Sequence, residues 1–117
     1  MEIDSFQKYN LQGFSVIGKM CDLNDYQHLQ SYFNNMKINK KKFIIDLSRL
    51  TFSSSHGLGL FIEIAQKLQK SNTEIFLYKP REEINTIISL IGLNQVIPII
   101  HSEKELKKII VNEPECV

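Results

Sequence analysis

Apolar and polar positions alternate along the chain with two different periods, and each change of period marks a new secondary-structure element. The pattern predicts strands over residues 3–8 and 14–20, joined by a hairpin or short loop over residues 10–13. Apolar residues at helical spacing predict the first helix over residues 24–36. The nearly continuous apolar run over residues 43–47 is typical of a strand that is buried on both faces of a parallel sheet.

A broad apolar face with charged residues opposite it predicts an amphipathic helix over residues 57–70. The apolar run over residues 75–78 predicts the next buried strand. A third helix follows, with Pro80 in its first turn and Gly92 as its C-terminal stop.

The last two predicted elements are a strand over residues 96–100 and a final helix that begins with a capping box at Ser102. Proline has no N–H to donate to a neighbouring strand, so Pro98 indicates that the strand lies at an edge of the sheet. The predicted order is ββαβαβαβα, an α/β fold with a mostly parallel or mixed sheet of four to five strands and about four helices packed on it. We expect one domain over residues 1–111 and a flexible tail over residues 112–117.

Composition and charge indicate one globular domain and argue against several other classes of protein. The chain has 117 residues, of which 43% are hydrophobic and 23% charged, as expected for one globular domain. A formal net charge of +1 gives no electrostatic reason to expect a nucleic-acid partner. Cys21 and Cys116 lie far apart without a CxxC pair, which argues against a disulfide scaffold or a zinc site. Without an apolar run of about 20 residues or a signal-peptide pattern, we expect a cytoplasmic protein with no membrane span.

Chemistry-bearing residues concentrate in the segment over residues 46–60, which follows a predicted buried strand and runs into a predicted helix. Binding sites of parallel sheets gather at such carboxyl ends of strands. Three consecutive serines precede the helix, and the pattern leaves two roles open for Ser55. It can cap the helix, or it can accept a phosphoryl group whose charge the helix N-terminus would stabilise. The two roles are compatible in different states of the protein.

Known catalytic spacings do not fit this segment. A hydrolase elbow requires glycine where Ser53 stands, and the neighbouring side chains of Ser55 and His56 diverge, which argues against a Ser–His pair. There is no phosphate-binding G-x-x-x-x-G-K-[ST] loop. Asp22 and Asp25 do not form the acidic pocket of a receiver domain. We therefore predict a protein that is not an enzyme and that requires no cofactor or metal.

The same segment resembles the signature of the STAS domain family. There, a D-L-S strand leads through an aromatic residue to D-S-S-G-L-G at the start of a helix. The matching residues in this chain are Asp46, Leu47, Ser48, Phe52, Ser55, Gly57, Leu58 and Gly59. Gly18 and the Ile91-Gly92-Leu93 segment resemble further family positions, so the resemblance extends along nearly the whole chain.

The resemblance implies an anti-sigma-factor antagonist, a partner-switching regulator that binds a serine kinase of the histidine-kinase-like ATPase fold. The kinase would phosphorylate Ser55, with Ser54 as the second candidate, and a phosphatase would reverse the modification. The unmodified protein would capture the kinase and release the sigma factor, whereas a phosphoryl charge of about −1.5 to −2 would disrupt docking. The expected partner-binding residues are Ser53, Ser54, Ser55, His56, Gly57, Met20, Cys21 and Asp22.

Two positions depart from the family signature, and a second function stays open. Ser54 stands at the family's aspartate and His56 at its second serine. The chain also resembles single-domain STAS proteins that act as subunits of phospholipid-transport ABC complexes. The resemblance to these proteins implies docking on the transporter ATPase through the same surface, without the need for a phosphorylated serine. For either function we expect a monomer or a weak dimer.

Overall fold

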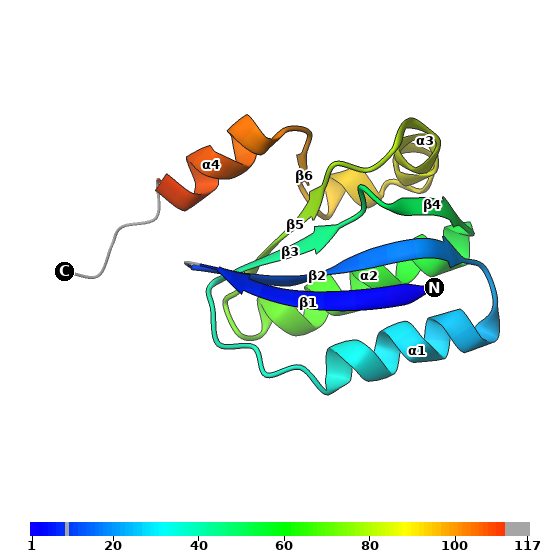
Figure 1. The fold of residues 1–117 in the computed structure, drawn as a ribbon, viewed down its shortest axis with the longest axis horizontal. Coiled ribbons are helices and arrows are strands. Elements are labelled where there is room, and N and C mark those ends of the chain that lie inside the picture. Colours follow the sequence, from blue (N-terminus) through cyan, green and yellow to red (C-terminus); the bar gives the residue numbers. More distant parts are fainter. Residues whose placement is uncertain (9, 112–117) are drawn as a thin grey trace.

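A computed structural model describes residues 1–8 and 10–111 of the chain. In chain order its elements are β1 (Glu2–Lys8), β2 (Leu11–Met20), α1 (Leu23–Asn34), β3 (Lys42–Asp46), β4 (Leu50–Ser53), α2 (Ser55–Gln69), β5 (Glu74–Tyr78), α3 (Glu82–Ile91), the short 3₁₀ helix η1 (Leu93–Gln95), β6 (Ile99–Ile100) and α4 (Glu103–Val111). Figure 1 shows how these elements are arranged. The predicted α/β class is confirmed, and the predicted tail over residues 112–117 lies outside the described residues.

The strands form one mixed sheet in the order β1-β2-β3-β5-β6, and β4 pairs with the far end of β2. Among the residues that the structure describes, only β1 and β2 pair antiparallel, and the other strand pairs are parallel. The prediction of a mostly parallel sheet is confirmed. β6 lies at an edge of the sheet, as Pro98 indicated, and the Pro98 carbonyl accepts a hydrogen bond from the Leu77 N–H at 3.0 Å.

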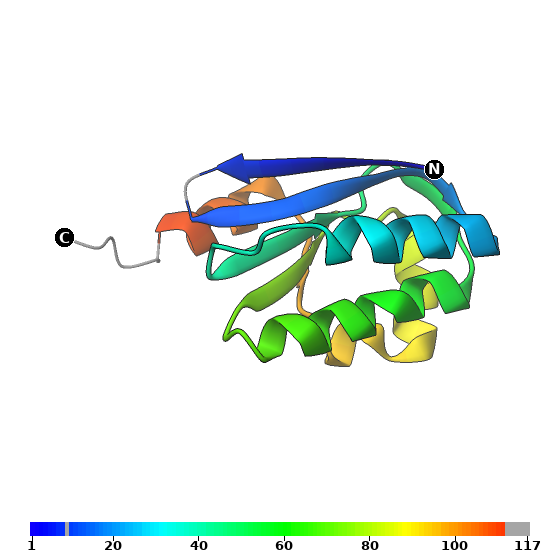
Figure 2. The same cartoon turned by 90° about the horizontal axis from the view of Figure 1, so that it is seen from below.

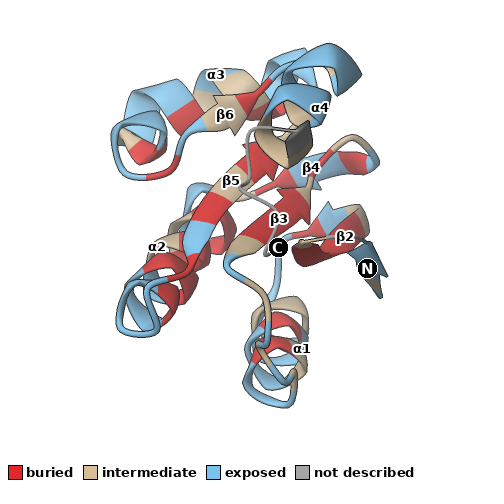
Figure 3. Ribbon diagram, turned by 90° about the vertical axis from the view of Figure 1, so that its left-hand side faces the viewer, coloured by how far each residue is buried: buried red, intermediate tan, exposed pale blue. Residues whose placement is uncertain are grey.

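Helices cover both faces of the sheet, unequally. The larger apolar core joins one face to α1, α2 and α3, and Figure 2 shows α1 and α2 side by side on that face. A smaller cluster on the opposite face packs against α4. Figure 3 shows the buried residues along the central strands β3 and β5. Neighbouring residues of β3 divide between the two cores: Phe43 and Ile45 belong to the larger one and Ile44 to the smaller one, so β3 is buried on both faces as predicted.

Gly13 lies inside β2, although the sequence pattern placed it in the loop over residues 10–13. The strand begins at Leu11, and Gly13 pairs with Ile44 of β3. A Cβ atom at Gly13 would lie 1.9 Å from the Ile44 carbonyl oxygen. Glycine is therefore required here by the close approach of two central strands rather than by a turn.

The predicted element bounds were wrong at three other places. β4 was missed because it has only four residues, too few for an alternating pattern to be recognised. The predicted strand over residues 96–100 is a strand only at Ile99–Ile100, because the chain turns at Val96 and bends at Ile97 as it leaves η1, and Val96 is half exposed. Pro80 lies before the N-cap residue Arg81 of α3 and not in its first turn.

None of the helices that the structure describes is long and apolar enough to cross a lipid bilayer.

Candidate functional site

Three helices begin at the same end of the sheet, where parallel strands reach their carboxyl ends. α1 follows β2, α2 follows β4 and α3 follows β5, which places their N-termini at the right-hand end of the molecule in Figure 1. The Ser54 N–H donates a hydrogen bond to the Met20 carbonyl at 3.1 Å and so ties the start of α2 to the end of β2. This end of the sheet carries the segment that the sequence singled out.

The residue that caps α2 is Ser54. Its backbone is extended, with φ −69° and ψ 159°, and its side-chain oxygen accepts a hydrogen bond from the Gly57 N–H at 3.0 Å. The expectation that Ser55 caps the helix was therefore wrong. The helix begins at Ser55, two residues earlier than predicted, because β4 carries the extended chain through Ser53.

The three consecutive serines have three different environments. Ser53 is 1% exposed, and its hydroxyl donates to the Ser54 carbonyl oxygen at 2.9 Å. Ser54 is half-buried, and its hydroxyl oxygen also lies 2.6 Å from the Tyr26 hydroxyl. Ser55 is exposed in the first turn of α2, and no residue that the structure describes makes a hydrogen bond to its hydroxyl. Of the three serines, Ser55 is therefore the one whose side chain is exposed and makes no hydrogen bond among the described residues.

Tyr26 of α1 is a site residue that the sequence reasoning missed. Its hydroxyl contacts Ser54, and its ring meets the His56 ring edge to face, with centroids 4.7 Å apart. The start of α1 and the start of α2 are thereby joined through side chains. The position of Tyr26 in the first turns of a helix that follows a parallel strand was the available signal, because the N-termini of such helices meet at one end of a sheet.

The other predicted partner-binding residues divide by exposure. Cys21, Asp22 and His56 are exposed, whereas Met20 and Gly57 are buried. A Cβ atom at Gly57 would lie 2.9 Å from the Ser53 hydroxyl and 3.1 Å from the Met20 side chain. Met20, Ser53 and Gly57 therefore pack beneath the surface and hold the start of α2 in place, and the exposed residues form the surface itself.

Two exposed apolar side chains lie at this end of the sheet. Leu23, the first residue of α1, is 66% exposed, and Phe52 of β4 is 48% exposed. Large apolar side chains on an otherwise polar surface are a common feature of protein–protein contacts. The surface around Ser55 thus combines an exposed hydroxyl with exposed apolar side chains.

The carboxylates of Asp22 and Asp25, near Cys21, cap the N-terminus of α1. Asp22 caps that helix by accepting from the Asp25 N–H at 3.0 Å, and the Asp25 carboxylate accepts from the Cys21 and Asp22 N–H groups at 2.9 and 3.4 Å. This reciprocal capping box satisfies N–H groups at the start of the helix. The side-chain atoms of Cys21, Asp22 and Asp25 that could bind a metal ion lie within 4.8 Å of one another. The two carboxylates, however, already accept the hydrogen bonds that cap α1.

The capping box makes a testable prediction about pH. The hydrogen bond from the Cys21 N–H lowers the pKa of the Asp25 carboxyl below its ordinary value of 3.8, and the Asp22 N–H adds to the effect. Asp25 therefore stabilises the fold above pH 4 or so, and this contribution is lost as the pH falls through its folded-state pKa. NMR titration of the side-chain carboxyl should give a midpoint lower in the folded chain than in the urea-unfolded chain. Equal midpoints would contradict the capping geometry.

The comparison with known proteins agrees with this architecture. The sequence matches the STAS domain over residues 8–106. The chain belongs to the STAS domain family. The resemblance inferred from Asp46 to Gly59 is thereby confirmed, and the match covers strands β2 to β6 together with the α2 N-terminus.

Solved STAS structures have the same fold at low sequence identity. An anti-sigma factor antagonist from Mycobacterium paratuberculosis is 20% identical, with a TM-score of 0.78 over 95% of this chain and 96% of that one. The unphosphorylated anti-sigma factor antagonist SpoIIAA, a Bacillus protein, is 14% identical, with a TM-score of 0.72 over 92% and 96%. A sulfate transporter family protein from Wolinella succinogenes is 13% identical, with a TM-score of 0.73 over 89% of each chain. These similarities establish the fold of this STAS domain.

Proposed function

We propose that this STAS domain is an anti-sigma-factor antagonist that acts in the cytoplasm, binds a serine kinase of the histidine-kinase-like ATPase fold, and is released from it when Ser55 is phosphorylated. A phosphatase returns Ser55 to the unmodified, binding form. The domain itself performs no catalysis.

The observation that carries this proposal is the difference between Ser55 and its two neighbours. Ser53 is buried, and Ser54 is held by the Gly57 N–H and the Tyr26 hydroxyl. Phosphorylation of Ser54 would break both contacts and remove the helix cap. Ser55 is exposed with an unoccupied hydroxyl among the described residues, so it is the acceptor that leaves the fold unchanged.

The position of Ser55 also accounts for the effect of a phosphoryl group. At the first residue of α2 the added negative charge lies beside the positive end of the helix dipole, which stabilises it. The same charge lies at the end of the sheet that carries the exposed Leu23 and Phe52. Burying a dianion with these apolar groups in an interface incurs a large desolvation cost, so the partner dissociates.

A second candidate function is a subunit of a phospholipid-transport ABC complex that docks on its ATPase. The likeness to a sulfate transporter family protein supports it, because a STAS fold is present in a transport protein as well. His56 at the position of the family's second serine also favours a docking surface that does not depend on phosphorylation. Both functions use the surface around Ser55.

Affinity purification from the source cell, followed by mass spectrometry, distinguishes the two. Recovery of a histidine-kinase-like ATPase supports the antagonist, and recovery of an ABC ATPase supports the transporter subunit. The recovered kinase and ATP should then label the wild type and Ser71→Ala, a control at an exposed turn beyond the end of α2, but not Ser55→Ala. Full labelling of Ser55→Ala would exclude Ser55 as the acceptor.

A further inference from the structure

Lysines gather at the end of the sheet opposite the one that carries Ser55. The β1–β2 hairpin, the segment between α1 and β3, the turn between α2 and β5, and the end of α4 all lie there, at the left of Figure 1. The lysines of these segments are Lys8, Lys37, Lys40, Lys41, Lys42, Lys70, Lys107 and Lys108. In the described part of these segments the one acidic residue is Glu74, whose carboxylate pairs with Lys42 at 3.0 Å. Glu113 and Glu115 follow α4 in the sequence, and lysines still clearly outnumber acidic residues. The small net charge of the chain is thus unevenly distributed, and this lysine-rich end is strongly positive.

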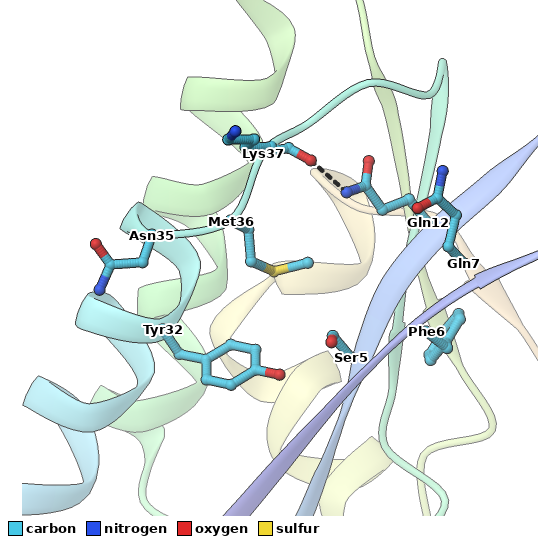
Figure 4. A pocket seen from close by; sticks show the side chains of 8 residues that line it. All are labelled: Ser5, Phe6, Gln7, Gln12, Tyr32, Asn35, Met36 and Lys37. Atoms are coloured by element: carbon cyan, nitrogen blue, oxygen red, sulfur yellow. Dashed lines mark hydrogen bonds between the residues drawn. The ribbon is translucent and has the colours of Figure 1, made fainter.

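The segment between α1 and β3 is held through its backbone, which leaves its lysine side chains at the surface. The Gln12 side chain donates a hydrogen bond to the Lys37 carbonyl oxygen, as Figure 4 shows, and accepts one from the Asn39 N–H at 3.0 Å. The Glu74 N–H donates to the Lys41 carbonyl oxygen at 2.9 Å. The side chains of Lys37 and Lys41 are exposed. The segment therefore presents its charges from a fixed position, and a partner that binds them need not order the chain first.

An apolar groove lies at the same end of the molecule. It has a volume of about 740 Å³ and separates the β1–β2 hairpin from α4. Its apolar walls are formed by Phe6, Leu11, Leu106 and Ile110, and Lys107 also lines it. Figure 3, which faces this end, shows α4 as half-buried and exposed, and its apolar side chains pack only partly against the sheet. Apolar groups therefore stay within reach of the surface, beside the lysines.

Lysines next to accessible apolar side chains are typical of surfaces that bind anionic membranes. A helix that lies on a bilayer buries apolar side chains at the boundary between headgroups and acyl chains, while its lysines contact anionic headgroups. Nucleic-acid phosphates would also attract the lysines, but the phosphate backbone offers nothing to an apolar groove. We propose that the lysine-rich end binds the surface of a bilayer that contains anionic phospholipid, with acyl chain entering the groove beside α4.

This orientation directs the Ser55 end away from the bilayer. The starts of α1 and α2 lie at the opposite end of the sheet from the lysines, so the surface around Ser55 stays accessible to a protein partner. The inference does not depend on the proposed function, because neither Ser55 nor its surface takes part in lipid binding. Ser55→Asp should therefore bind vesicles as the wild type does.

Co-sedimentation of the full chain with lipid vesicles tests the proposal. We expect binding to vesicles of equal parts phosphatidylglycerol and phosphatidylcholine, and none to phosphatidylcholine alone. Lys41→Gln combined with Lys107→Gln should weaken binding about 25-fold, because each lysine near an anionic surface contributes about fivefold. Lys19→Gln combined with Lys79→Gln is the matched control. It removes the same charge from two exposed lysines outside the lysine-rich end, so it should bind as wild type.

Tryptophan fluorescence tests which end meets the lipid, since the chain has no tryptophan of its own. Ile110→Trp, in the wall of the groove, should be quenched by vesicles whose phosphatidylglycerol carries bromine on its acyl chains. Phe52→Trp, on the exposed surface near Ser55, should not be quenched.

Three results would overturn the proposal. The first is a chain that does not bind anionic vesicles, and the second is binding that the two lysine pairs weaken equally or not at all. The third is a bound chain in which Ile110→Trp is not quenched. Binding to duplex DNA or RNA that depends on Lys41 and Lys107, without binding to vesicles, would assign the lysine-rich end to nucleic acid instead.

Discussion

Replacement of Gly13 by alanine is expected to destabilise the fold by about 3 kcal/mol, the upper part of the range for an overpacked core position. The added Cβ atom would lie 1.9 Å from the Ile44 carbonyl oxygen and 2.8 Å from the carbonyl carbon. Both are backbone atoms of β3, which cannot rotate away as a side chain can. The two central strands must separate, and the parallel pairing of Gly13 with Ile44 is lost.

Equilibrium denaturation in urea, followed by circular dichroism, measures this change. Gly59→Ala is the matched control, because a Cβ atom at Gly59 meets nothing within 4 Å and the residue lies inside α2. Alanine there should raise the free energy of unfolding by roughly 0.5–1 kcal/mol. The two glycine-to-alanine changes are thus expected to have opposite signs. A Gly13→Ala chain as stable as wild type would mean that β2 and β3 are farther apart than described.

The main elements of the fold were predictable because the spacing of apolar residues along the sequence indicates which side chains of each element are buried. The run Phe43, Ile44, Ile45 predicted a strand buried on both faces, and the structure divides these residues between two apolar cores. Pro98 predicted an edge position, and β6 lies at an edge. In both cases a local property of the sequence determines where the strand lies in the sheet. For β3 this property is the continuous apolar run, and for β6 it is the missing N–H of Pro98.

The parts that were wrong depend on contacts between segments distant in sequence. Gly13 was assigned to a turn because glycine is common in turns, but its role is set by the backbone of β3 thirty-one residues later. β4 consists of Leu50–Ser53 and is defined by pairing with the end of β2. Neither pairing is visible in the local sequence, so the helix that follows β4 was predicted to begin too late.

In the candidate site, too, the local sequence predicted some features, and others depend on contacts with distant segments. The motif located the α2 N-terminus and Ser55, but it did not distinguish which serine caps the helix. That distinction depends on the backbone angles of Ser54 and on Tyr26, which comes from another helix. The motif also led us to expect Met20 among the partner-binding residues, and the structure places its buried side chain next to Gly57.

Replacement of Ser55 by aspartate is expected to separate partner binding from stability. A carboxylate at the first residue of α2 interacts favourably with the helix dipole, so the free energy of unfolding should stay equal to wild type or rise by about 0.3–1 kcal/mol. The same charge, brought against a partner together with the exposed Leu23 and Phe52, should weaken binding of the purified kinase by about tenfold or more. Calorimetric titration and urea denaturation measure the two effects on the same protein.

Two neighbouring variants control for the change at Ser55. Ser55→Ala keeps the surface uncharged and should bind as wild type does. Ser54→Ala removes the cap to the Gly57 N–H and the contact with Tyr26, so it should lower the free energy of unfolding by about 1 kcal/mol. Stability lost at Ser54 and affinity lost at Ser55→Asp would assign the cap and the switch to adjacent residues. A Ser55→Asp chain that binds the kinase as tightly as wild type would instead mean that charge at this position does not control docking.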